Sequence, residues 1–309
     1  MTAPASEPSP WHAGERAFHR ELGVSERMEE IGPRVLRDHL IDQHREFYPL
    51  LPFAVFGTAD SAGNPWATLR DGAPGFLTAP DASRLAVRLP RDPSDPADAG
   101  FAEGASIALL GIDPATRRRN RLNGMVSETA SGFEIAVQQS FGNCPKYIHR
   151  RAPHFARPPA SPAPAAAEPL RPDDGRIAGR LAVADTLFVA SYMDGEGPRQ
   201  MDVSHRGGRP GFVTSDGDGA FVIPEYAGNR FYNTLGNIRL NGRAGLTVPD
   251  FTDGSLLQMT GRARLDDTPA DGLPAGVERF WRFRPEQAVL RPEALALRYT
   301  LKEWSPFVP

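Results

Sequence analysis

The chain has 309 residues, enough for two domains of ordinary size, and its 40% hydrophobic and 24% charged residues are typical of a soluble globular protein. A formal net charge of -3 disfavours general binding to nucleic acid or anionic lipid, and a single cysteine, Cys144, excludes an intrachain disulfide and a cysteine-based zinc site. The first ten residues lack a secretory signal and no run approaches the ~18 apolar residues of a membrane span, so we expect a cytoplasmic protein without a membrane or nucleic-acid partner.

Residues 1–50 are predicted to form an N-terminal helical segment. Apolar residues recur there at spacings of three and four, and the pattern ends before Pro49. From Leu51 onward the pattern changes to short apolar runs separated by turn residues, which is typical of β-strands. The runs at 53–56, 85–89 and 107–112 are strand candidates, and we assign residues 51–151 to a first β domain.

Residues 152–180 are predicted to be a linker rich in proline and alanine. Seven prolines lie between Ala152 and Pro172, and such a composition buries too little apolar surface to fold, which predicts an extended, semi-rigid connector. The β pattern then resumes, and residues 181–309 are assigned to a second β domain. Its strand candidates are 187–190, 211–214, 221–223 and 256–260.

The two β domains resemble each other in sequence. Residues 70–79 (RDGAPGFLTA) and 206–215 (RGGRPGFVTS) share six of ten identities at an offset of 136, and later strand candidates match at offsets of 138 and 137. Similarity at a nearly fixed period indicates repeated structural units. We therefore predict a tandem duplication.

The copies differ between their third and fourth strand candidates. In the second copy, residues 226–241 predict a short helix with Asn229, Arg230 and Asn233 around its start, where free N–H groups, the helix dipole and an arginine suit a phosphate. In the first copy, residues 90–103 contain four acidic residues and three prolines, which would repel a phosphate. The difference predicts one phosphate-bearing ligand per chain.

The first copy carries a basic run, Arg117 to Arg121, at the entry to a strand candidate. Because alternate side chains of a strand share a face, Arg119, Arg121 and Asn123 should point the same way. Two interpretations stay open. The run either protects a solvated edge strand by charge, or completes, from across the domain interface, the pocket that the second copy begins.

Four sequence segments resemble a known family. Residues 119–124 (RNRLNG) and the Asn-Thr-Leu-Gly-Asn-Ile segment beginning at Asn233 are similar to the FMN-binding split barrel of pyridoxamine 5'-phosphate oxidases, and residues 202–208 (DVSHRGG) and 140–147 are similar to the oxidase-related proteins of the two-barrel subgroup. The resemblance implies a mainly β (α+β) fold, with two tandem six-stranded antiparallel split β-barrels after the N-terminal helical segment. It implies FMN in the groove between the barrels.

The resemblance also assigns site residues. The segment containing Asp202, Ser204, His205 and Arg206 matches the strand that lies along the flavin and its phosphate, and the segment at Asn229, Arg230 and Asn233 matches the one that grips the phosphate. The sequence departs from the oxidases at residues 228–230 and at its C-terminal end, so we do not expect pyridoxamine 5'-phosphate oxidase activity itself.

The leading functional hypothesis is an FMN-dependent oxidoreductase, in which the flavin carries the electron chemistry and the protein binds and orients it. Its partner would be a small-molecule substrate or electron donor. A non-catalytic carrier of flavin or haem and a scaffold that binds nothing are the alternatives. The sequence identifies no catalytic residue and no metal site, and it leaves a homodimer open.

Overall fold

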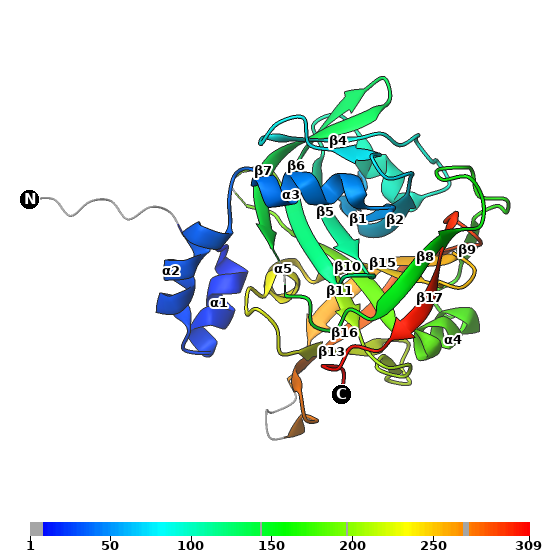
Figure 1. Cartoon of the computed structure of the whole chain (residues 1–309). Helices are drawn as coiled ribbons and strands as arrows, with labels where there is room; N and C mark the ends of the chain where they lie inside the picture. The colour runs from blue at the N-terminus through cyan, green and yellow to red at the C-terminus, as the bar shows by residue number, and fades with distance from the viewer. Residues whose placement is uncertain (1–8, 143, 196, 268–271) are drawn as a thin grey trace, which may run out of the picture.

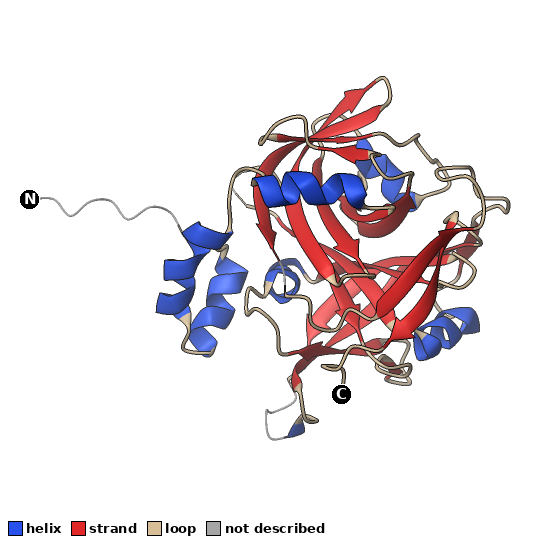
Figure 2. Ribbon diagram, viewed as in Figure 1, coloured by secondary structure: helices blue, strands red, loops and turns tan. Residues whose placement is uncertain are grey.

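The protein is mainly β with a few helices (Figure 2), as the composition and the resemblance predict. The computed structural model describes residues 9–142, 144–195, 197–267 and 272–309. Residues 1–8 of the predicted helical segment, and residues 143, 196 and 268–271 of the predicted β domains, lie outside the described residues. Within the described part of the chain, no helix is long and apolar enough to cross a membrane.

The N-terminal segment is helical, but it contains several short helices instead of one continuous run. They are α1 (Ala13–Glu21), α2 (Ser25–Val35), α3 (Asp42–Phe47) and the 3-10 helix η1 (Tyr48–Leu50). The interruption after α2 has a tertiary cause, because Arg37 exchanges two backbone hydrogen bonds with Ser140 of the first sheet. In Figure 1, α1 lies between α2 and α5 (Asn233–Asn241), whereas α3 lies across the first sheet.

The first half of the chain forms a seven-stranded antiparallel sheet in the order β2-β1-β5-β6-β7-β4-β3. Six strands were expected, and the seventh, β3, has only two residues. The strands are β1 Phe53–Ala59, β2 Pro65–Asp71, β3 Leu77–Thr78, β4 Arg84–Val87, β5 Ser106–Asp113, β6 Arg118–Thr129 and β7 Gly132–Gly142. The 3-10 helix η2 (Pro96–Phe101) occupies the acidic stretch between β4 and β5.

The second half forms a sheet with the same strand order, β11-β10-β14-β15-β16-β13-β12. Its strands are β10 Thr186–Met193, β11 Gln200–Gly207, β12 Thr214–Ser215, β13 Phe221–Tyr226, β14 Arg243–Pro249, β15 Leu256–Leu265 and β16 Val277–Arg291. The strand candidate at 211–214 is wrong for its first three residues, because Gly211 has a φ of 90° and the Phe212 N–H closes a turn on Arg209. Duplication as the origin of the shared order stays a prediction.

The predicted linker takes part in the sheets. At its start, β8 (Arg150–Phe155) pairs with β17 (Leu297–Glu303), and in its middle β9 (Glu168–Leu170) pairs with β16. At its end, α4 (Gly175–Val183) begins on the capping side chain of Asp174. The expectation of a connector that cannot fold is therefore wrong for these stretches, because strand pairing uses backbone groups and needs few apolar side chains.

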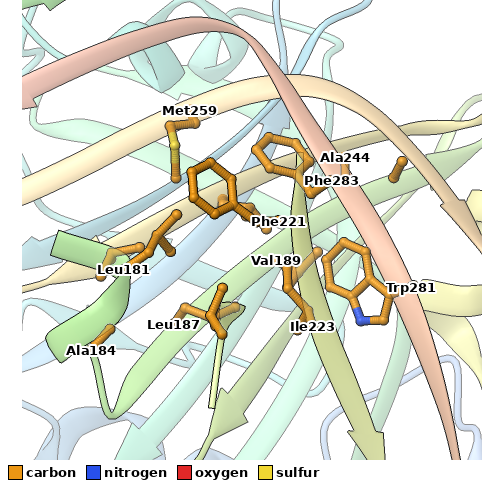
Figure 3. Close-up of a cluster of buried hydrophobic side chains, with 14 of the residues drawn as sticks. Leu181, Ala184, Leu187, Val189, Phe221, Ile223, Ala244, Met259, Trp281 and Phe283 are labelled. Carbon is orange, nitrogen blue, oxygen red and sulfur yellow. The ribbon is translucent and has the colours of Figure 1, made fainter. Parts of the chain in front are cut away.

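Each half has an apolar cluster of its own, and a further cluster joins the two halves. One lies on the first sheet and includes Phe47 of α3, and a second lies on the second sheet around Trp281 and Phe283 (Figure 3). The third cluster lies between the halves and joins residues such as Phe53 of β1 and Phe188 of β10. Because each half buries its own core and shares another, the strands that meet at the interface hold their side chains in defined places.

Candidate functional site

Strand β6 carries the basic run, and it is not an edge strand. It lies between β5 and β7, and Arg119 and Arg121 face the second half of the chain. The edge-strand interpretation is therefore wrong, since both backbone edges of β6 are already paired. The run instead brings first-half arginines to residues of β11 and α5.

Arg121 ties the two halves together. Its guanidinium forms a buried ion pair with Asp202 and donates to the Ser204 hydroxyl at 2.8 Å and to the Asn233 side-chain oxygen at 3.2 Å. Its Cζ atom lies 5.2 Å from the centroid of the Phe141 ring. Arg121 is 2% exposed, so its charge is offset by Asp202 within the interface and is not available to a ligand without breaking this pair.

Helix α5 begins four residues later than the predicted phosphate-binding start at Asn229. Tyr232, with a φ of 60°, is its N-cap, and the side chain of Asn233 in its first turn donates to the carboxylate of Glu15 from α1. Burial raises the pKa of Glu15 to about 8. Two acidic side chains, Glu15 and Asp202, therefore lie around the helix start, because Thr234 also donates to Asp202 at 3.4 Å.

A pocket opens beside this network, and we call it the arginine pocket. Its volume is about 80 Å³, and it lies between β6 and the 144–147 loop of the first half and β11, β13 and the α5 entry of the second half. Four cationic side chains line it against one carboxylate, that of Glu225. They are Arg119, Arg121, Lys146 and Arg206.

Arg119 and His205 bring unused polar atoms to the arginine pocket. The side chain of Arg119 makes no hydrogen bond or ion pair with any described residue, and burial lowers its pKa to about 9, with the charge of Arg121 adding to the effect. The buried Nδ1 of His205 also lacks a partner among the described residues. Burial, with Arg119 next, holds the pKa of His205 well below its ordinary value, so its imidazole is neutral at pH 7.

The remaining walls of the arginine pocket contain an arginine that is ion-paired with a glutamate and two tyrosine rings. Arg206 pairs with Glu225 at 2.8 Å. The rings of Tyr147 and Tyr226 lie 5.2 Å apart and face the pocket from the two halves. The 144–147 loop approaches β11 so closely that a Cβ at Gly207 would lie 2.1 Å from the Tyr147 carbonyl oxygen, which explains glycine there.

The structure brings most of the predicted site residues together. The arginine pocket contains Arg119, Arg121, Ser204, His205, Arg206, Asn229 and Asn233. Asn123 and Asp202 line a smaller adjacent pocket behind Asn233. Arg230 lines neither pocket; it has a φ of 64° and an exposed side chain, and its backbone carbonyl oxygen lies 3.1 Å from His19 Nε2.

Sequence reasoning missed Glu15, Lys146, Tyr147, Glu225 and Tyr226 as site residues. Two of these carried a signal, because Lys146 and Tyr147 belong to the 140–147 segment on which the family resemblance rests. Glu15 carried none, since its contact with Asn233 spans 218 positions of the chain.

No protein-family profile matches the chain, and no curated protein matches it in sequence. Solved structures that resemble it include a candidate pyridoxamine 5'-phosphate oxidase from Corynebacterium glutamicum, with 15% identity, a TM-score of 0.29, and coverage of 41% of this chain and 98% of that one. The FAD binding protein from Mycobacterium smegmatis has 12% identity, a TM-score of 0.28, and coverage of 41% and 97%. The haem storage protein HutZ from Vibrio cholerae has 12% identity, a TM-score of 0.28, and coverage of 40% and 96%. The family that the sequence resembles is thus among these neighbours, at a similarity that carries no argument about ligand or activity.

Proposed function

We propose that the protein binds FMN with its phosphate in the arginine pocket. The observation that carries the proposal is Arg119, a half-buried cation whose side chain forms no ion pair with any described residue. A buried charge is costly unless it is paired, and a phosphate offers several acceptor oxygens to a guanidinium. Lys146 and Arg206 line the same pocket, so the local charge favours an anion.

The size of the pocket indicates which part of the cofactor it accepts. A volume of about 80 Å³ is well below the ~300 Å³ at the lower end of small-molecule sites, so the phosphate is the part of FMN that fits. The Tyr147 and Tyr226 rings supply aromatic faces at the pocket wall, next to the cations. The residues that would hold the phosphate are Arg119 first, then Lys146, with Arg206 held in place by Glu225.

When bound, the flavin supplies electron or hydride transfer, and the protein contributes binding, orientation and local charge. Arg119 and Arg206 place positive charge at one end of the site, and neutral His205 supplies a hydrogen-bonding nitrogen at its wall. Turnover of a small-molecule substrate as an FMN-dependent oxidoreductase is the catalytic form of this proposal. It is tested by the rate at which bound FMN is reduced by NADH or NADPH and then reoxidised, compared with free FMN.

The test of binding compares two neighbouring arginines on opposite faces of β6. Arg119→Gln should weaken FMN binding roughly tenfold to a hundredfold, because a charge-assisted hydrogen bond contributes about 1.5–3 kcal/mol, and riboflavin, which lacks the phosphate, should bind as before. Arg118→Gln is the matched control, since Arg118 is exposed and lies over the Phe47 ring. Isothermal titration with both flavins measures the affinities.

Two results would count against the proposal. Equal losses for FMN and riboflavin in Arg119→Gln would mean that the residue supports the fold. Unchanged FMN affinity would place the phosphate elsewhere, and Arg230→Ala, which removes the exposed arginine that the sequence resemblance favoured, would then be the next variant to measure.

Haem binding is a second candidate, and His205 favours it. Its neutral imidazole would be the axial ligand of the haem iron and the cations of the pocket would pair with the propionates, which requires the arginine pocket to open, since its volume of about 80 Å³ does not hold a porphyrin. The visible spectrum of the purified protein separates the candidates, because a flavin spectrum supports the first and a Soret band supports the second. A Soret band that persists in His205→Ala would exclude His205 as the ligand.

A further inference from the structure

A second cavity, larger than the arginine pocket, lies where the end of β16 packs against the first half of the chain. Its volume is about 500 Å³. Its walls are Leu69 and Arg70 of β2, residues 89–94 after β4, Arg291 of β16, and residues 160–166 of the predicted linker, and we call it the linker cavity.

The linker cavity holds the same position in the first sheet as the arginine pocket holds in the second. Leu69 pairs with a residue of β1 that also pairs with β5, and His205 pairs with a residue of β10 that also pairs with β14. Leu69 and His205 therefore occupy equivalent positions in the two sheets. The offset of 136 that relates them also relates Arg70 to Arg206. Each sheet therefore presents a corresponding corner to the other half.

The contacts across the interface are also reciprocal. By strand register, Gln258 of β15 corresponds to Arg121 of β6. Arg121 donates to the Ser204 hydroxyl of β11 at 2.8 Å, and Gln258 Nε2 donates to the Ala67 carbonyl oxygen of β2 at 3.0 Å. A neutral amide thus replaces a guanidinium at the corresponding place.

The charges of the linker cavity are balanced by the protein itself. The acidic stretch that was predicted to repel a phosphate supplies the counter-ions: Asp95 lies 3.2 Å from Arg291, Asp98 lies 3.3 Å from Arg70 and 2.7 Å from Arg91, and Asp92 also pairs with Arg291. All three arginines that line the cavity have a carboxylate partner. An incoming anion would meet these carboxylates instead of an unpaired cation.

The remaining lining is mostly apolar. Leucine, alanine and proline side chains cover much of the wall, from Leu69 and Leu89 to the linker and Ala294. The terminal nitrogens of Arg291 are already paired with Asp92 and Asp95, so this arginine adds no free charge to the wall. A volume of this size lies within the range of about 300–1,000 Å³ that is usual for small-molecule sites.

We propose that the linker cavity binds an uncharged, largely apolar small molecule, and that it excludes phosphorylated ligands. The proposal does not depend on flavin binding at the arginine pocket. It assigns a ligand class to the linker cavity, in which the FMN proposal places no ligand.

The probe is 6-propionyl-2-(dimethylamino)naphthalene, an uncharged fluorophore with one ketone oxygen whose emission shifts to the blue in an apolar site. We expect saturable binding at one probe per chain, with an affinity that inorganic phosphate and FMN do not change. Ala294→Trp, which fills the cavity from the β16 side, should weaken the probe at least tenfold. Ala163→Trp, on the linker wall, should act in the same direction without altering either sheet.

Two matched variants complete the design. Ala62→Trp introduces the same bulk in an exposed turn and should leave the probe affinity unchanged. Arg119→Gln should also leave it unchanged, because Arg119 lies at the other corner. Absence of a saturable blue shift, an unchanged probe affinity in both filling variants with wild-type circular dichroism, or displacement of the probe by FMN or phosphate would each overturn the proposal.

Discussion

The two corresponding corners of the molecule differ in how they treat charge. At the arginine pocket, Arg121 and Asp202 form a buried pair, and Arg119 beside them lacks a counter-ion among the described residues. At the linker cavity, Gln258 replaces the arginine and an acidic stretch neutralises each lining arginine. The same arrangement of strands can therefore favour an anion in one corner and an uncharged ligand in the other.

The largest expected effect comes from removing the contact that crosses the interface in each corner. Asp202→Ala should lower the free energy of unfolding by about 3–5 kcal/mol, because it leaves Arg121 as an uncompensated buried charge. Gln258→Ala removes hydrogen bonds of a neutral side chain and should cost about 1–3 kcal/mol. Urea denaturation of both variants measures the difference. Equal losses of unfolding free energy would contradict the view that a buried ion pair is used at the arginine pocket and a neutral hydrogen bond at the linker cavity.

The next effect is a pH dependence at Glu15, which lies at the start of α5 beside the arginine pocket. The pKa of Glu15 is raised from 4.5 to about 8 by burial, so folding favours the protonated carboxyl, and this contribution to stability is complete below pH 4.5 and is lost as the pH rises through 8. Relative to Glu15→Gln, the wild-type protein should therefore lose stability between these pH values, by at most about 1.4 kcal/mol per pH unit.

Thermal or urea unfolding at several pH values tests this expectation. Glu30→Gln, on the exposed face of α2, is the control and should show the wild-type pH profile. A parallel pH profile for Glu15→Gln and the wild type would mean that water or a cation reaches Glu15 in solution.

The smallest effect concerns Lys146 and its counterpart. Gly142 of β7 and Leu290 of β16 are corresponding residues of the two sheets. Lys146 and Ala294 each follow four residues later, so Ala294 is the counterpart of Lys146. Lys146→Ala should weaken FMN by less than about fivefold, since a partly exposed ion pair contributes about 0.2–1 kcal/mol, and the loss should shrink at high salt. Titration at two salt concentrations measures it, and a loss as large as that of Arg119→Gln would show that Lys146 is the main phosphate ligand.

Several features of the fold could be predicted from local sequence patterns. The N-terminal helical segment and the strand candidates at 53–56, 107–112 and 256–260 correspond to observed helices and strands, because their hydrophobic periods reflect the faces that they bury. The alternation around Arg119 and Arg121 predicted a shared face, and both residues line one pocket. The linker strands β8 and β9 could not be predicted in this way, because their pairing depends on backbone hydrogen bonds with distant strands.

The candidate site was less predictable than the fold. The sequence placed Arg230 at a helix start, but the left-handed backbone at Arg230 and Tyr232 delays α5 to Asn233 and leaves the Arg230 side chain exposed. Arg206 was expected to grip a phosphate, but Glu225 of β13, a strand that is not paired with β11, forms an ion pair with it. Such pairings depend on how the sheet folds in three dimensions, and adjacent sequence does not contain that information.

The sequence by itself determined many of the helices and strands, that two similar β regions exist, and that the first has an acidic stretch where the second has none. These properties follow from hydrophobic period and local composition. Only the tertiary structure decided which charges remain unpaired. Arg121 and Asp202 are 81 positions apart, and Arg291 and Asp92 are 199 apart, yet both pairs form, whereas Arg119 receives no such partner among the described residues. Long-range packing brings these charged groups together away from water. A charged side chain that is shielded from water and has no partner is then a favourable contact for a ligand of opposite charge.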